Sequence, residues 1–119
     1  MNWYLAKIVF RIICGDGSHT AQFDEQLRLI VARDEDEAFY KAQSLGVQEE
    51  DTFLNVQQKP VQWQFINVCE LYRVTGLIDG AELYSSIREA GDAEEYINLV
   101  HKKAEGIQEK QTHKLLHLL

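Results

Sequence analysis

The chain has 119 residues, of which 45% are hydrophobic and 26% charged; this composition is typical of one folded domain and excludes a disordered or low-complexity chain. Its 19 acidic residues outnumber its 12 basic ones and give a net charge of −7. Because binding to phosphates requires clustered Lys and Arg, we expect neither nucleic acid nor an anionic membrane surface as a partner.

The ends and the cysteines favour a cytoplasmic protein. No stretch approaches the ~20 apolar residues of a membrane span, and the first residues lack the pattern of a signal peptide. Cys14 and Cys69 are too few for a secreted disulfide framework, so we expect both thiols to be reduced. The chain is interpreted as one domain over 1–119, with a sheet-and-helix core at 1–74 and a helical extension at 75–119.

Two strands are predicted near the start. Residues 3–14 alternate, with the even positions from Tyr4 to Cys14 all suited to burial. The odd positions include Trp3, Leu5 and Val9, so the second face of this strand also needs a cover. A turn at 15–18 leads to a strand over about 23–33, and we expect the two to form an antiparallel hairpin.

Helices are predicted where an aspartate is followed three residues later by a glutamate, since each side chain then accepts from the other's backbone N–H. This spacing begins three amphipathic runs, at Asp34, Asp79 and Asp92. In the first run Gly46 is expected to adopt the left-handed conformation of a C-terminal cap.

Two further strands are expected at about 52–57 and 61–73, with a bulge near Asn67 where the alternation of apolar residues shifts. The predicted fold is therefore α+β, in the order β-β-α-β-β-α-α, with a mostly antiparallel four-stranded sheet and the helices packed on it.

Several of these segments resemble an uncharacterised bacterial family of small domains. The matches are the opening Trp3-Tyr4-Leu5-Ala6-Lys7, the helix start at Ala32 with Glu37-Ala38, the alternating Val61, Trp63 and Phe65, and Leu71-Tyr72. The resemblance covers about 3–74 and implies a discrete domain. Since the function of that family is unknown, the resemblance implies no catalytic or binding residues.

The segment around the first turn is the most site-like part of the sequence. Asp16 and His19, with Asp24 and Glu25 across the loop, would suit proton transfer or a divalent cation. The alternative is a solvated hairpin loop in which glycine permits the turn and aspartate caps it. No nucleophile is paired with a base, so we favour the loop and keep a small hydrolase-like or ligand-binding enzyme as the alternative function.

Two other candidates have simple structural explanations. Cys14 lies five residues before His19, but it continues the buried register of its strand, where a thiol is a small inert hydrophobe; Cys69 is interpreted in the same way. His113 and His117 have the i, i+4 spacing of metal ligands but no third ligand close in sequence. We expect no metal site and no cofactor.

Surplus apolar residues suggest self-association instead. The chain ends in four leucines over its last five residues, and exposed termini are seldom so apolar. We therefore predict a non-enzymatic interaction or scaffold domain, a homodimer that can also bind a protein partner. The predicted interface residues are Trp3, Leu5, Val9, Leu115, Leu118 and Leu119.

Overall fold

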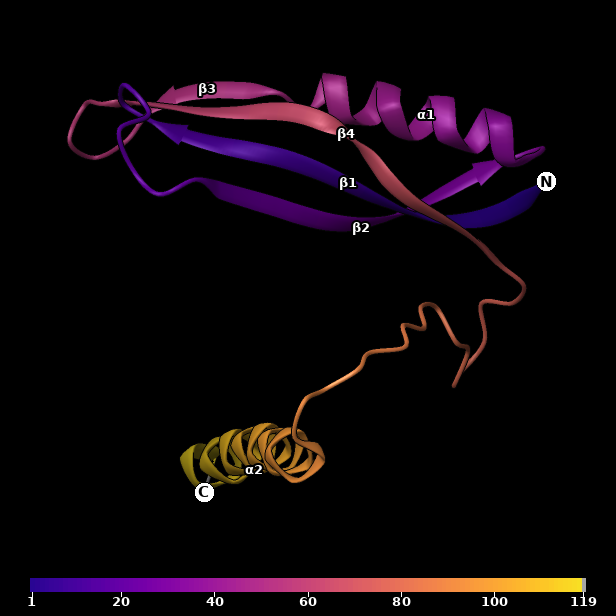
Figure 1. Cartoon of the computed structure of the whole chain (residues 1–119), viewed down its shortest axis with the longest axis vertical. Coiled ribbons are helices and arrows are strands. Elements are labelled where there is room, and N and C mark those ends of the chain that lie inside the picture. The colour runs from indigo at the N-terminus through magenta and orange to yellow at the C-terminus, as the bar shows by residue number, and fades with distance from the viewer. Residues whose placement is uncertain (119) are drawn as a thin grey trace. The chain divides into compact units, whose positions relative to one another are not determined.

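The computed structural model describes residues 1–118 and divides the chain into two compact units, Met1–Ser85 and Ser86–Leu119. Each unit is described by itself. Within the described residues, the first unit contains a four-stranded antiparallel sheet in the order β2-β1-β4-β3, as Figure 1 shows. The strands are β1 (Asn2–Cys14), β2 (Gln22–Ala32), β3 (Asp51–Leu54) and β4 (Pro60–Val74).

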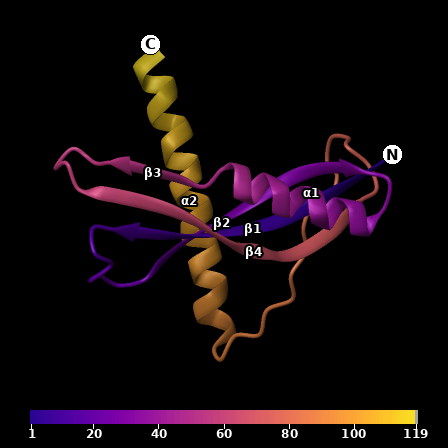
Figure 2. The same cartoon turned by 90° about the horizontal axis from the view of Figure 1, so that it is seen from above.

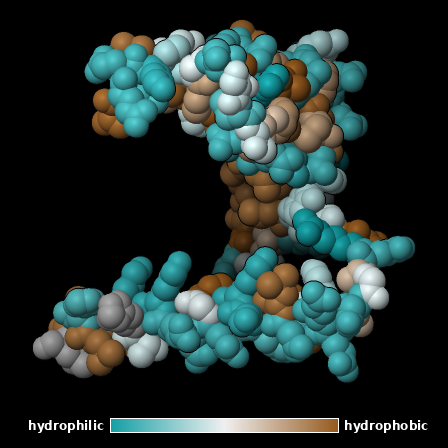
Figure 3. Space-filling model, turned by 60° about the vertical axis from the view of Figure 1, so that its left-hand side comes forward, coloured by the Kyte–Doolittle hydropathy of each residue, from teal (hydrophilic) through white to brown (hydrophobic). Residues whose placement is uncertain are grey.

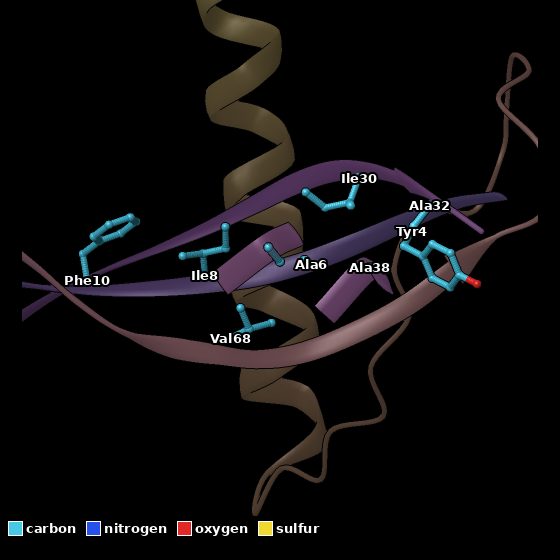
Figure 4. Packing of buried hydrophobic residues seen from close by; sticks show 9 residues of the cluster. Tyr4, Ala6, Ile8, Phe10, Ile30, Ala32, Ala38 and Val68 are labelled. Carbon is cyan, nitrogen blue, oxygen red and sulfur yellow. The ribbon is translucent and has the colours of Figure 1, made fainter. Parts of the chain in front are cut away.

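One helix, α1 (Glu35–Gln48), packs on one face of this sheet (Figure 1). From above, α1 lies over the end of the sheet near the N-terminus, and β3 lies toward the other end (Figure 2). The even positions of β1 from Tyr4 to Phe10 are buried, as predicted. They point toward α1, which presents small side chains to them. The resulting core, drawn in Figure 4, contains Tyr4, Ala6, Ile8, Phe10, Ile30, Ala32, Ala38, Ala42 and Val68.

The start of α1 confirms the predicted cap. The Oδ1 of Asp34 accepts the backbone N–H of Glu37 at 2.9 Å. The Glu37 carboxylate binds the Arg33 guanidinium, with Nε and Oε2 2.5 Å apart, instead of completing a reciprocal pair with Asp34. Glu37 thus binds the charged Arg33 guanidinium in place of the backbone N–H of Asp34, because hydrogen bonds between two charged groups are stronger.

Gly46 corrects the prediction of a C-terminal cap. The helix continues to Gln48, and Gly46 is buried inside it. A Cβ at this position would lie 2.4 Å from the ring of Phe65 on β4. Gly46 is therefore needed for the close approach of α1 to the sheet.

The predicted irregularity near Asn67 is confirmed. The pairing of β1 with β4 shifts register twice, between Lys7 and Ile8 and between Val9 and Phe10, on either side of Asn67. The Oδ1 of Asn67 accepts the backbone N–H of Val68 at 2.8 Å and the side-chain amide of Gln43 at 3.0 Å. A polar side chain at this point thus binds both the interrupted strand and α1.

The helix predicted from Asp79 is wrong. Residues 78–81 form a turn in which the Ala81 N–H donates to the Ile78 carbonyl at 3.0 Å and Gly80 has a φ of +84°. The residues that follow have no regular structure up to the start of the next helix. A short helix has a costly nucleus, and here the Tyr84 ring packs edge-on against Tyr72 of β4 at 5.6 Å, a contact outside any helix.

The second unit contains α2 (Ala93–Leu118), which begins as predicted at Asp92. Asp92 caps it through Oδ1, which accepts the Glu95 N–H at 3.2 Å. The α+β class and the four strands in their order are therefore confirmed, as are the first and the last of the three predicted helices. In the described part of the chain, no helix combines the length and the hydropathy that a membrane crossing requires.

Candidate functional site

The loop between β1 and β2 satisfies its own polar groups. Asp16 Oδ1 accepts the backbone N–H of Ser18 at 2.9 Å, and hydrogen bonds from Ser18 lower the pKa of the Asp16 carboxyl. Gly15 and Gly17 have φ angles of +60° and +83°, a region that favours glycine. These are the features of the solvated turn.

His19 closes this loop onto the backbone of β1. Its Nε2 accepts the N–H of Cys14 at 2.9 Å, and its Nδ1 lies 2.8 Å from the carbonyl oxygen of Thr20. A carbonyl only accepts, so this arrangement uses the tautomer in which Nδ1 donates and Nε2 accepts. The imidazole therefore uses both nitrogens on backbone groups, and its partner in Cys14 is the amide, not the thiol.

Asp24 and Glu25 point to opposite faces of β2. Asp24 lies on the face that carries α1, where its Oδ2 accepts from Trp63 Nε1 at 3.2 Å and from Gln26 Nε2 at 2.6 Å. Glu25 lies on the other face, 3.9 Å from Lys7 Nζ. The four candidate residues of the sequence therefore do not converge. Among the side chains that the structure describes, no group of three His, Cys, Asp or Glu could hold a metal ion.

Asp24 instead begins a polar chain that continues along β2 to the end of α1. Arg28 Nη1 donates to Gln26 Oε1 at 3.0 Å, and the Arg28 guanidinium binds Glu49 through two hydrogen bonds of 2.6 and 2.8 Å. The hydrogen bonds from Arg28 lower the pKa of the Glu49 carboxyl, and burial only partly opposes them. This series of hydrogen bonds connects the C-terminal end of α1 to β2.

The Arg28–Glu49 pair predicts a pH-dependent contribution to stability. A carboxyl with a lowered pKa stabilises the fold above its ordinary pKa of about 4.5, and this stabilisation is lost as the pH falls through the folded value. We expect Glu49→Gln to lower the free energy of unfolding at pH 7 by about 0.5–1 kcal/mol, because the pair is partly exposed. Urea unfolding at pH 7 and at pH 3 measures this.

Glu35→Gln is the matched control, since Glu35 is an exposed acid in the same helix. The difference between Glu49→Gln and the wild type should shrink at the acid pH. A difference of the same size at both pH values would contradict the assignment.

The opposite face of the sheet is not covered by α1, and we call it the helix-free face. It carries the odd positions of β1 and β2 and, from β4, Glu70, Tyr72 and Val74, which pair with Lys7, Leu5 and Trp3. Leu5 and Val74 are buried on this face, and Val9 is half-buried. Its exposed apolar side chains, which we call the apolar patch, are Trp3, Phe23, Leu27, Leu29 and Tyr72.

The apolar patch has substantial contact with solvent. Trp3 is 42% exposed and Phe23 56% exposed, whereas Leu5 is 4% exposed. The space-filling view shows a continuous hydrophobic area on the side of the first unit away from α1 (Figure 3). Of the predicted interface residues on β1, Trp3 is thus accessible and Leu5 is already covered.

An ion-pair cluster lies beside the apolar patch. Lys7 Nζ is 3.5 Å from Glu70 Oε2 and 3.9 Å from Glu25 Oε2. Burial alone would lower the pKa of Lys7, but the two carboxylates raise it overall. Burial, with the negative charge of Glu70, raises the pKa of Tyr72. The helix-free face therefore offers both apolar and charged groups.

Sequence reasoning missed Phe23, Leu27 and Leu29 as surface residues. The prediction of a strand over about 23–33 did not include which of its faces would be buried. The signal was present in the hairpin: β1 pairs Leu5 with Leu29 and Lys7 with Leu27, so odd positions share a face. The even positions of β1 fill the core, which leaves the odd positions of β2 outside.

The second unit also exposes apolar residues. Leu115 and Leu118 are both exposed on α2, and Leu119 lies outside the described residues. The visible side of α2 is mostly hydrophilic, with a few hydrophobic side chains among the hydrophilic ones (Figure 3). The side chain of His113 is likewise outside the described residues, so the expectation that His113 and His117 form no metal site stays a prediction.

The two cysteines differ from each other. Cys14 is half-buried at the end of β1, and Cys69, at one of the register shifts of β4, is exposed. The expectation of a buried Cys69 is therefore wrong. Because residues are inserted at a bulge, the side chain there leaves the core register.

The extent of the first unit matches a known family. A family model described as "Domain of unknown function (DUF4288)" matches residues 3–85, which corresponds closely to the unit Met1–Ser85. The chain belongs to the DUF4288 family. No curated protein and no solved structure matches it. The resemblance to an uncharacterised family is thus confirmed, and this DUF4288 chain adds a helical unit after the family domain.

Proposed function

We propose that this DUF4288 chain is a self-associating protein-interaction domain, a homodimer whose contact includes the apolar patch. The observation that carries the proposal is the exposure of Trp3, Phe23, Leu27, Leu29 and Tyr72 on one face of the sheet. Aromatic residues are enriched at the centres of protein interfaces, where their burial contributes most of the binding energy.

The size of the apolar patch supports this role. An aromatic side chain buries about 150–250 Å² when it is covered completely, so five partly exposed residues present an area on the order of 400–500 Å². Apolar patches of roughly this size on monomers are often functional. A standard interface buries about 800 Å² per partner, and the charged groups of Lys7, Glu25 and Glu70 would supply a polar rim.

The C-terminal leucines belong to the same proposal. Leu115 and Leu118 are exposed on α2 and give a second apolar surface that a partner copy would cover. Leu119, outside the described residues, follows them in the sequence. We also propose that the protein acts in the cytoplasm. Cys14 and Cys69 are unpaired, which suits a reducing compartment.

Size-exclusion chromatography with light scattering tests the proposal. We expect Leu27→Asn combined with Leu29→Asn to shift the protein toward the mass of a monomer, because the patch loses its apolar centre. Val56→Asn is the control, since Val56 is fully exposed in the loop before β4. If the wild-type protein is monomeric at every concentration up to about 1 mM, any self-association is too weak to matter and the proposal is overturned.

A shortened chain tests the contribution of the C-terminus. Removal of residues 112–119 is expected to weaken the dimer while leaving the circular dichroism of the sheet unit unchanged. If the shortened chain associates with the same affinity as the full chain, the C-terminal leucines have no part in the interface.

A further inference from the structure

The free edge of β2 is long and regular. Within the described residues, the outer side of this strand pairs with no other strand, because β2 is the first strand of the sheet. Its register with β1 runs without a shift from Gln22 to Ala32, and it contains no proline. Soluble proteins usually protect edge strands by shortness, bulges or proline, as the four-residue β3 at the opposite edge illustrates.

The helix beside this edge leaves it accessible. A groove of about 760 Å³ lies between β2 and α1. Its lining includes Leu29 and Val31 of β2 and Tyr40, Ser44 and Gln48 of α1. Near the end of the strand the Lys41 Nζ donates to the Val31 carbonyl at 2.5 Å. A strand that approached β2 from outside would therefore pair with the backbone before this position, beside apolar and polar side chains, the arrangement used when a strand is added to a sheet edge.

We propose that the occupant of this edge is β2 of a second copy, paired antiparallel about Gln26, so that the two sheets form one sheet of eight strands. The inference rests on the proposed self-association and adds its geometry. In this register Arg28 of each copy lies opposite Asp24 of the other, and Leu29 lies opposite Phe23. Each contact occurs twice because the pairing is symmetric.

Charge complementarity selects this register. In a pairing about Leu27, Arg28 would lie opposite the neutral Gln26 and Asp24 opposite Ile30, so neither charge would face an opposite one. The pairing about Gln26 instead joins opposite charges across the strands, which stabilises antiparallel pairs. Arg28 can make the additional contact, since its guanidinium has five N–H groups and its bonds to Gln26 and Glu49 use three.

The same pairing extends the apolar patch. A two-fold axis perpendicular to the sheet places both helix-free faces on the same side. Phe23, Leu27 and Leu29 lie on β2 at the junction, so the patches of the two copies become continuous. The two patches would then form one wider apolar surface.

Disulfide crosslinking of the full-length chain tests the register. In a background of Cys14→Ala and Cys69→Ser, Gln26→Cys is expected to form a covalent dimer on mild oxidation. Paired residues in an antiparallel sheet have Cα atoms about 4.5–5.5 Å apart, within the range a disulfide spans. Leu27→Cys would lie opposite Glu25, with its own copy two residues away, so it should crosslink poorly. Val56→Cys measures random collision.

The outcomes separate the two proposals. Crosslinking of Gln26→Cys well above the level of Val56→Cys supports the inference. Efficient crosslinking of Leu27→Cys in place of Gln26→Cys overturns the register. If light scattering finds a dimer but neither variant crosslinks above the collision level, the edge pairing is wrong and self-association stands. If the wild-type protein is monomeric, both the edge pairing and the proposed self-association are wrong.

A charge exchange gives an independent test. Asp24→Arg and Arg28→Asp each bring like charges together in the homodimer, and we expect each to weaken it about tenfold. When the two folded variants are mixed, every facing pair has opposite charges, so a heterodimer should form with affinity restored. A mixture that associates no better than either variant alone would overturn the proposed register.

Discussion

Replacing Phe10 by alanine is expected to lower the free energy of unfolding of the first unit by about 3–5 kcal/mol, the range for a buried phenylalanine. Phe10 is 1% exposed and is among the largest fully buried side chains. Its ring meets the edge of Phe65 at 6.0 Å with an interplanar angle of 61°. Alanine would leave a cavity between β1, β4 and α1. Urea denaturation followed by circular dichroism measures the change.

Phe23→Ala is the matched control for this prediction. Phe23 lies on the neighbouring strand of the same hairpin but is 56% exposed on the helix-free face. Its loss should cost less than about 1.5 kcal/mol, because little buried surface disappears. Equal effects of the two substitutions would mean that the two faces of the sheet are not distinguished as described.

The local patterns of the sequence predicted where strands and helices lie better than they predicted what these elements pack against. The alternation at Tyr4, Ala6, Ile8 and Phe10 predicted β1 and its buried face, because the period of a strand is set by the backbone alone. Asp34 and Asp92 predicted helix starts, since a cap acts within four residues. The same spacing failed at Asp79, where the turn at Gly80 and the contact of Tyr84 with Tyr72 give a competing arrangement.

The candidate site was predictable only in part. Trp3 was identified as a surface residue because one strand had two apolar faces. The burial of Leu5 and the exposure of Phe23 depend on which strands become neighbours, and this is not encoded in either segment by itself. The separation of Asp24 from Glu25 could have been predicted, because adjacent residues of a strand point to opposite faces.

Gly46→Ala is expected to destabilise the first unit by about 1–2 kcal/mol, although alanine is the better helix former. The helix would gain up to about 1 kcal/mol from the substitution. The new methyl group, however, would lie 2.4 Å from ring carbons of Phe65. That ring is packed against Phe10, so either the ring or α1 must move, and overpacking of this kind costs about 1–3 kcal/mol.

Ser44→Ala tests whether the sign of this effect comes from packing. Ser44 lies two residues earlier on the exposed side of α1, so alanine there gains helix propensity without a clash, and we expect no loss of stability. A Gly46→Ala protein as stable as Ser44→Ala in the same denaturation experiment would contradict the packing role. If Gly46→Ala is instead less stable than Ser44→Ala, the close contact between α1 and the sheet at Gly46 outweighs the higher helix propensity of alanine.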